Sequence, residues 1–235
     1  MTDMKFLSAM GLLLSITCCI HAENSFRLIF TQQNFNTKKQ LPKNWHFRGK
    51  IGTDKPIYSL AKDAKTGKEC LRITTQVASG TILHDISGVL SKYPVMRWKW
   101  KVNTYPPGAD GRREEVDDQA VAIYVGSGGF FSNHSVAYRW ETETPKGFEG
   151  KVKYAGGLAK VNWITLRNKT DGKGKWIVEE RNVAEDLKKL FDGKVPKEVV
   201  VSISANSQYT KSNSQAEVEY IEFLPAPLKT DSKKK

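Results

Sequence analysis

Cysteine is scarce in this sequence, and its placement excludes an internal disulfide. The 235 residues include three cysteines. Cys18 and Cys19 stand inside an N-terminal apolar segment that we expect to be removed. The remaining chain keeps only Cys70, so no partner is left for an internal cross-link. Apolar and polar residues alternate around Cys70, as in a strand, and this setting does not predict an activated thiolate.

Several patterns that identify common enzyme classes are also missing. No two of His46, His84 and His134 have the spacing of a metal-binding pair. The sequence lacks the turn motif of a serine nucleophile. Its glycine-rich segment, residues 126–129, lacks the lysine of a phosphate-binding loop. The sequence therefore gives no support to a zinc enzyme, a serine hydrolase or a nucleotide-binding protein.

Beyond its N-terminus, the sequence lacks an apolar run long enough to cross a membrane. Residues 6–20 are almost wholly apolar, follow Lys5 and precede the small residue Ala22. This pattern predicts a cleavable signal peptide over residues 1–22. Lipidation at Cys18 or Cys19 is the alternative, but the residues before each cysteine fit a lipidation site poorly. We therefore predict a periplasmic or secreted protein, with cleavage near Ala22.

Positive charge predominates, with a formal net charge of +12 and a pI of about 9.5. Part of the excess lies in residues 229–235, which we expect to be a disordered basic tail after a single domain over residues 23–228. A basic balance favours anionic partners such as phospholipid headgroups or acidic glycans, although solubility is the commoner reason for it. Export and the lack of a recognised motif argue against nucleic acid. The oligomeric state is not indicated.

Short strand-like segments follow one another along most of the chain. In residues 96–102, apolar residues alternate with basic ones, which predicts a half-buried strand. Residues 57–61 and 70–76 flank a turn-rich segment and predict a hairpin. The apolar run 120–125 predicts a strand covered on both faces. Further strands are predicted over residues 136–141, 163–167, 176–180, 199–205 and 216–223.

The last of these strands alternates less cleanly than the others. Val218 and Tyr220 fall on one face, and Ile221 falls on the other together with Glu217 and Glu219. Such mixed faces predict a position at an edge or between two sheets.

One helix is predicted late in the chain. Asn182 suits the cap of a helix over residues 183–191, with Glu185 and Asp186 in the first turn. Many short strands with one short late helix predict a mostly β fold. We expect a two-sheet β-sandwich of the jelly-roll or galactose-binding-like type.

Four segments, taken in order, resemble the DUF3047 family of exported bacterial proteins, a family of unknown function. They are residues 94–102, 117–125, 136–140 and 180–187. The resemblance covers residues 26–223 approximately. It implies export from a Gram-negative cell and a sandwich related to galactose-binding and carbohydrate-module folds, which does not establish a function. The chain departs from the family at Asn206 and Gln208, where carboxylates are expected, so chemistry that relies on those carboxylates is in doubt.

The densest acidic cluster spans residues 114–119. Asp117 and Asp118 end a loop before an apolar strand, where carboxylates can hold Ca²⁺; both are candidate ligand and metal residues. Glu115 and Asp117 match the first half of a jelly-roll glucanase pattern, but its second glutamate is missing, which argues against a glycosidase pair. The commoner alternative is a structural ion pair with an arginine such as Arg139.

Aromatic and basic side chains supply the other candidate contacts. Ring faces bind the apolar faces of sugars, although the same rings are typical of a sandwich core. A basic stripe on residues 97, 99 and 101 suits a carboxylated or sulfated glycan, although a solvated outer face is commoner. The candidate contacts are Trp100, Tyr138, Trp140, Arg97, Arg139 and Arg181.

These patterns lead to three hypotheses. The favoured one is an exported, non-catalytic domain that binds carbohydrate or cell-envelope glycan, with calcium as the candidate cofactor. The second is an envelope hydrolase or lyase acting on polysaccharide through Asp117, Asp118 and Glu141, or through Tyr138 or His134 in a lyase. The third is an interaction subunit of an envelope complex, with its basic tail against anionic headgroups.

Overall fold

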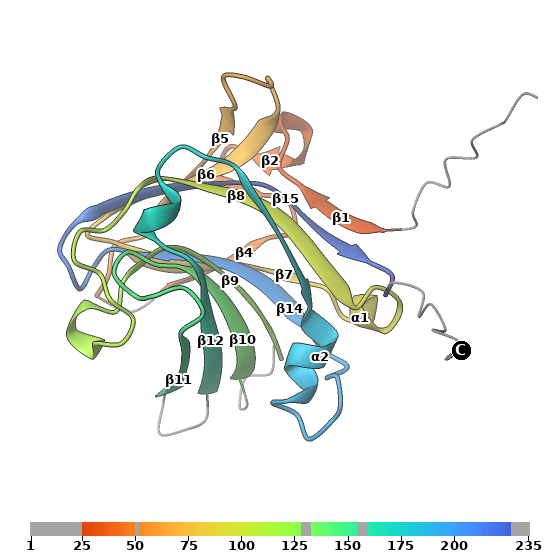
Figure 1. The fold of residues 1–235 in the computed structure, drawn as a ribbon. Coiled ribbons are helices and arrows are strands. Elements are labelled where there is room, and N and C mark those ends of the chain that lie inside the picture. Colours follow the sequence, from red (N-terminus) through yellow and green to blue (C-terminus); the bar gives the residue numbers. More distant parts are fainter. Residues whose placement is uncertain (1–24, 50–51, 128–132, 155–158, 227–235) are drawn as a thin grey trace, which may run out of the picture.

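The computed structural model describes residues 25–49, 52–127, 133–154 and 159–226. The predicted signal peptide and the predicted basic tail lie outside the described residues. The described chain folds into two stacked β-sheets, so the predicted mostly β sandwich is confirmed (Figure 1). Within these ranges, no helix has the length and apolar character needed to cross a membrane.

One sheet has six strands and forms the upper layer in Figure 1. Its order is β13 (Ile177–Asn182), β8 (Val95–Thr104), β15 (Asn213–Leu224), β6 (Glu69–Gln76) and β5 (Ile57–Lys62), and β1 (Phe26–Ile29) also pairs with β15. The strand pairs of this sheet are antiparallel. The predicted hairpin is present as β5 and β6.

The other sheet has seven strands and forms the lower layer. Its order is β11 (Glu149–Tyr154), β12 (Ala159–Arg167), β10 (Asn133–Trp140), β9 (Gln119–Gly126), β14 (Val200–Asn206), β7 (Ser79–Asp85) and β4 (His46–Gly49). β10 and β12 run parallel, because the chain forms the edge strand β11 before returning as β12. A small separate ribbon contains β2 (Phe35–Asn36) and β3 (Leu41–Pro42).

Aromatic side chains fill the space between the two sheets. The ring centroid of Trp98 lies 5.5 Å from that of Trp100 and 5.2 Å from that of Tyr138. Trp100 lies 5.3 Å from Trp140. The alternation of β8 and β10 places all four rings on the inner faces of their strands, so the predicted half-buried strand is confirmed and the rings form the core.

The alternation of β15 differs from the prediction. A β-bulge at Glu219 shifts the register, so Val218 and Ile221 both point inward and are fully buried. β15 also lies between β8 and β6 and is not an edge strand, so that prediction was wrong. Its outward carboxylates pair with cations on neighbouring strands, as Glu217 does with Lys101 at 2.6 Å. Cross-strand pairing of this kind makes a charged face compatible with a central strand.

Two short helices accompany the sheets. The predicted late helix is α2 (Val183–Lys188), which ends earlier than expected. The side chain of Asn182 accepts a hydrogen bond from the backbone N–H of Glu185 at 3.1 Å, as its predicted cap role requires. The sequence pattern does not predict α1 (Val89–Lys92), because a helix of four residues is too short to show a periodicity.

Candidate functional site

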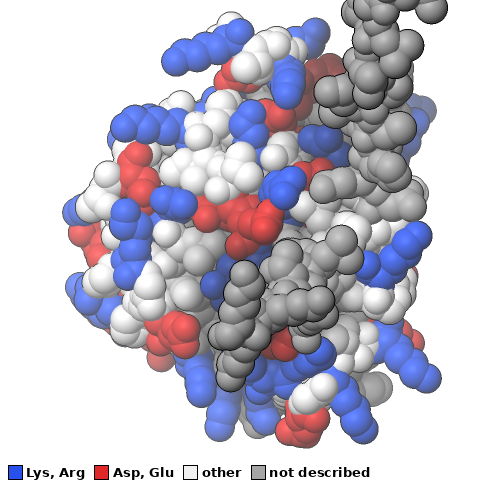
Figure 2. Space-filling view, turned by 45° about the vertical axis from the view of Figure 1, so that its right-hand side comes forward, with Lys and Arg blue, Asp and Glu red and all other residues white. Residues whose placement is uncertain are grey.

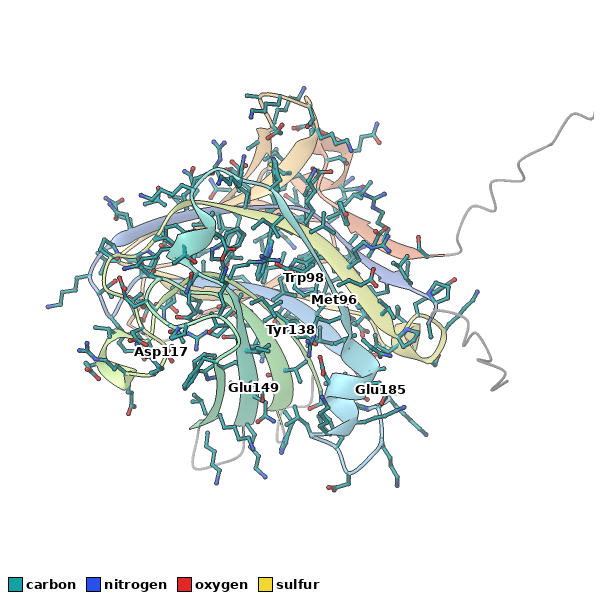
Figure 3. The ribbon with its side chains drawn as sticks, viewed as in Figure 1. Met96, Trp98, Asp117, Tyr138, Glu149 and Glu185 are labelled. Atoms are coloured by element: carbon teal, nitrogen blue, oxygen red, sulfur yellow. The ribbon has the colours of Figure 1, made fainter. Side chains whose placement is uncertain are left out.

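A groove of about 850 Å³ lies on the outer face of the seven-stranded sheet. Six neighbouring strands contribute to it, from β11 at one side to β7 at the other. The loops that precede β9 and β11 and that follow β14 also border it. Figure 3 shows Asp117 in this loop region, whereas Trp98 and Tyr138 lie between the two sheets. The groove is thus separate from the aromatic core.

Large and small side chains alternate across the outer face of the sheet beneath the groove. The strand register places Trp163 beside Ala137, and Ala137 beside Tyr124, which is followed by Ser202. Directly paired residues share a face of the sheet. Neighbouring strands are about 4.8 Å apart, so the backbones of Trp163 and Tyr124 are separated by about 10 Å. Ala137, between them, is fully buried, and Trp163 and Tyr124 line the groove.

Trp163 forms one wall of this groove and is itself closely packed. A Cβ added to Gly150, its partner on β11, would come within 2.1 Å of the indole ring. The guanidinium carbon of Arg139 lies 4.4 Å from the ring centroid, and the ring of Phe148 lies 5.4 Å away. Trp163 therefore orients Arg139 from one side and supports the more exposed ring of Phe148.

Arg139 is the charged centre of the groove. Its Nη2 donates hydrogen bonds to the Asp117 carboxylate and, at 2.7 Å, to the side-chain oxygen of Gln119. Its Nε lies 2.6 Å from Oε1 of Glu141. Two carboxylates flank one guanidinium, so its charge is compensated within the protein. The predicted ligand residues Asp117 and Arg139 are thus brought together as planar polar groups in fixed orientations.

Glu141 lies beneath the groove. Its side chain is fully buried, and Oε2 accepts hydrogen bonds from the Thr144 hydroxyl at 3.1 Å and the Gly111 amide at 3.3 Å. Burial raises the pKa of Glu141 to about 7; Arg139 opposes this rise, and Asp117 adds to it. A general acid has to reach its substrate, but the backbone of Gly111 covers this carboxyl. Glu141 therefore cannot reach a substrate as the general acid that the hydrolase hypothesis requires.

Asp118, predicted as a ligand and metal residue, accepts hydrogen bonds from the turn after β14. Its Oδ1 accepts a hydrogen bond from the Tyr209 amide at 3.2 Å. Its Oδ2 accepts bonds from the amide and the hydroxyl of Thr210, each at 2.7 Å. Its side chain is fully buried, so Asp118 holds a turn in place and does not face the groove.

These two aspartates do not fit a calcium site. Asp117 is committed to Arg139, and both oxygens of Asp118 accept bonds from protein donors. Ca²⁺ takes six to eight oxygen ligands. Across the described ranges, no three His, Cys, Asp or Glu side chains are grouped so that they could hold a metal ion.

The aromatic candidates lie in the core. Trp100, Tyr138 and Trp140 are at most 1% exposed, so the prediction that they stack on a ligand was wrong. Arg181 lies away from Asp117, beside α2, where it pairs with Asp186 at 2.8 Å. The hydroxyl of Tyr138 donates to the same carboxylate at 2.8 Å.

The predicted basic stripe lies on the outer face of the six-stranded sheet, and its charge is compensated. Arg97 pairs with Glu180 at 2.8 Å and with Glu222 at 3.5 Å. Lys99 pairs with Glu219 at 2.5 Å. The side of the molecule seen in Figure 2 also carries interspersed basic and acidic side chains. The stripe is therefore part of an ion-pair network and offers no separate anion site.

Sequence reasoning missed most of the groove. Trp163 begins a predicted strand, but nothing in the sequence distinguishes its ring from those of the core. Phe148 and Tyr209 stand in loops, where no periodicity marks an exposed ring. The groove residues that were not predicted as contacts include Gln119, Tyr124, Phe148, Trp163, Ser204, Asn206, Gln208 and Tyr209.

A family model described as a protein of unknown function, DUF3047, matches residues 43–222. The chain belongs to this family. The strands that line the groove of this DUF3047 domain lie inside the matched region. A comparison with curated proteins found no match.

Among solved structures, the chain is similar to a cellulase derived from Cel12A of Rhodothermus marinus. The identity is 12% over 83% of this chain and 98% of that chain, with a TM-score of 0.42. It is also similar to winged bean acidic lectin, determined with methyl-α-D-galactose, at 11% identity over 86% and 98% of the two chains and a TM-score of 0.40. At these values the likenesses carry no argument about function.

Proposed function

We propose that this DUF3047 protein is a non-catalytic domain that binds carbohydrate in the groove of the seven-stranded sheet. The most direct support is that this groove combines exposed aromatic residues with oriented polar groups. The groove-lining residues Phe148 and Tyr209 are 37% and 41% exposed, and the oriented pair of Asp117 and Arg139 lines the same groove. Sugars combine apolar C–H faces with many hydroxyls, so they need ring faces and fixed polar groups together.

The non-catalytic part of the proposal rests on the position of Glu141. This carboxyl has a pKa of about 7, as a general acid requires, but it is fully buried beneath Gly111. Asp117 is held by Arg139 and is not poised as a free nucleophile. An envelope hydrolase or lyase is the alternative hypothesis, and the experiment below tests it.

We test the proposal by exchanging the central carboxylate. Asp117→Asn keeps the shape but weakens the hydrogen bond to Arg139 and removes a charged acceptor from the groove. We expect the affinity for a bound glycan to fall about tenfold, or about 1.4 kcal/mol. Glycan-array binding followed by calorimetry on the strongest glycan measures it.

Glu180→Gln is the matched control, because it weakens a similar pair with Arg97 on the other sheet and should leave glycan affinity unchanged. Release of reducing ends by the wild type, lost in Asp117→Asn, would contradict the non-catalytic assignment. A folded wild-type protein that binds no glycan on the array would contradict carbohydrate binding altogether.

A further inference from the structure

The charges within the groove restrict the class of glycan that it suits. Arg139 is flanked by Asp117 and Glu141, and Arg112 pairs with Asp110 at 2.5 Å. Both arginines of the groove lining thus have carboxylate partners within the protein. The neutral polar groups beside them are hydroxyls and amides, on Ser79, Gln119, Ser204, Asn206 and Gln208.

The rim of the groove is balanced in charge. Glu149, Lys151 and Lys153, on the edge strand β11, and Glu114, in the loop before β9, are among its lining residues. The two lysines are exposed, and exposed lysines on an edge strand protect that strand from pairing with another chain. The rim thus contains two positive and two negative residues and has no excess of positive charge.

The two exposed aromatic rings stand far apart along the groove. Phe148 directly precedes β11, and Tyr209 follows β14. The Tyr209 amide donates a hydrogen bond to Asp118, directly before β9, and three strand spacings separate β9 from β11, which corresponds to about 14 Å. Arg139, on β10, lies between them. A single sugar ring is too small to contact both aromatic side chains.

We infer that the groove takes a neutral, linear oligosaccharide that lies across the strands, with Phe148 at one end, Tyr209 at the other and the Asp117–Arg139 pair between them. This inference rests on the proposed carbohydrate binding and adds the charge class, the length and the direction of the ligand. The hydroxyls of such an oligosaccharide contact protein groups whose orientations are already fixed. A carboxylate or sulfate on the sugar would instead approach arginines that are already paired with carboxylates of the protein, so a negative charge gains little.

Chain length is the first test. Calorimetry would use cello-, xylo-, manno- and galacto-oligosaccharides of two to six units, and we expect affinity to rise with length. Phe148→Ala and Tyr209→Ala should each weaken the binding of the hexasaccharide about tenfold, or about 1.4 kcal/mol. At least one of them should leave the disaccharide almost unaffected. Val178→Ala, at an exposed apolar residue of β13 on the other sheet, should change nothing.

Hexasaccharide binding no tighter than disaccharide binding would overturn the inferred length. So would variants of Phe148 and Tyr209 that retain wild-type affinity at every length. Thermal unfolding of each variant shows whether it remains folded, so a loss of binding is not mistaken for a loss of structure.

Charge is the second test, made with polymers that share a backbone. Binding to dextran or hydroxyethylcellulose should equal or exceed binding to dextran sulfate or carboxymethylcellulose, and it should hold between 50 and 500 mM NaCl. Preference for the anionic polymers, weakened by salt, would overturn the neutral class but leave carbohydrate binding intact. Binding to no polymer or oligosaccharide would instead contradict the proposed function itself.

Discussion

Glu141 is a carboxyl whose environment differs strongly from that of an exposed one. It is fully buried at the end of β10 and touches the charged centre of the groove through Arg139. Through the amide of Gly111 it also touches the loop that forms one end of the groove. The same carboxyl thus connects the groove floor with the groove wall, which is a structural role. Only its pKa resembles that of a catalytic acid.

The raised pKa of Glu141 has a consequence for stability. From its ordinary value of 4.5 it rises to about 7, so between these pH values the folded state holds more protons than the unfolded state. The free energy of unfolding should therefore fall as pH rises through this window, by at most about 3 kcal/mol. Urea unfolding at a series of pH values measures it, and Glu141→Gln should flatten this part of the curve.

Glu180→Gln, at the surface of the other sheet, should keep the wild-type slope. If Glu141→Gln and the wild type gave parallel curves between pH 4.5 and 7, the buried carboxyl would not be the group that titrates in this range.

At the scale of elements, the pairing of β11 with β12 shapes one side of the groove. Gly150 lies directly opposite Trp163, and the indole ring occupies the space that a side chain at this position would need. The glycine lets the ring lie flat along the edge strand. From there the ring faces Arg139 and supports Phe148.

Gly150→Ala should therefore displace the indole ring. We expect a loss of about 1–3 kcal/mol in the free energy of unfolding, as for other overpacked sites, together with weaker glycan binding. Denaturant titration and calorimetry would measure the two effects. Lys151→Ala changes the next residue of the same strand, which is exposed, and should have little effect on stability. Wild-type stability and binding in Gly150→Ala would show that the ring adapts without cost.

At the scale of the whole molecule, the two sheets present different outer faces. The outer face of the six-stranded sheet carries cross-strand ion pairs, as between Lys99 and Glu219 or Lys101 and Glu217. The outer face of the seven-stranded sheet carries the groove, with the exposed aromatic residues Phe148 and Tyr209. The two inner faces share one aromatic core. The proposed ligand site therefore lies on the seven-stranded sheet, opposite the ion-paired face.

We propose that the protein performs this role outside the cytoplasm, in the periplasm or after secretion. When the full chain is produced in a Gram-negative host, the periplasmic fraction should contain a protein that begins at Glu23. Intact mass spectrometry measures this. A lipid-modified mass beginning at Cys18 or Cys19 would favour the lipidation alternative, and an unprocessed protein that retains Met1 in the cytoplasm would contradict export.

The two-sheet class, the faces of β8 and the cap of α2 were predictable from sequence, because alternation and capping act between residues close together in the chain. Which aromatic rings are core and which face a groove follows from the folded arrangement instead. That outcome depends on strand pairing: Trp163 meets Gly150 and Arg139, Asp117 meets Arg139, and a bulge at Glu219 reverses a predicted face. Such contacts join distant segments, and no local pattern of apolar and polar residues encodes them.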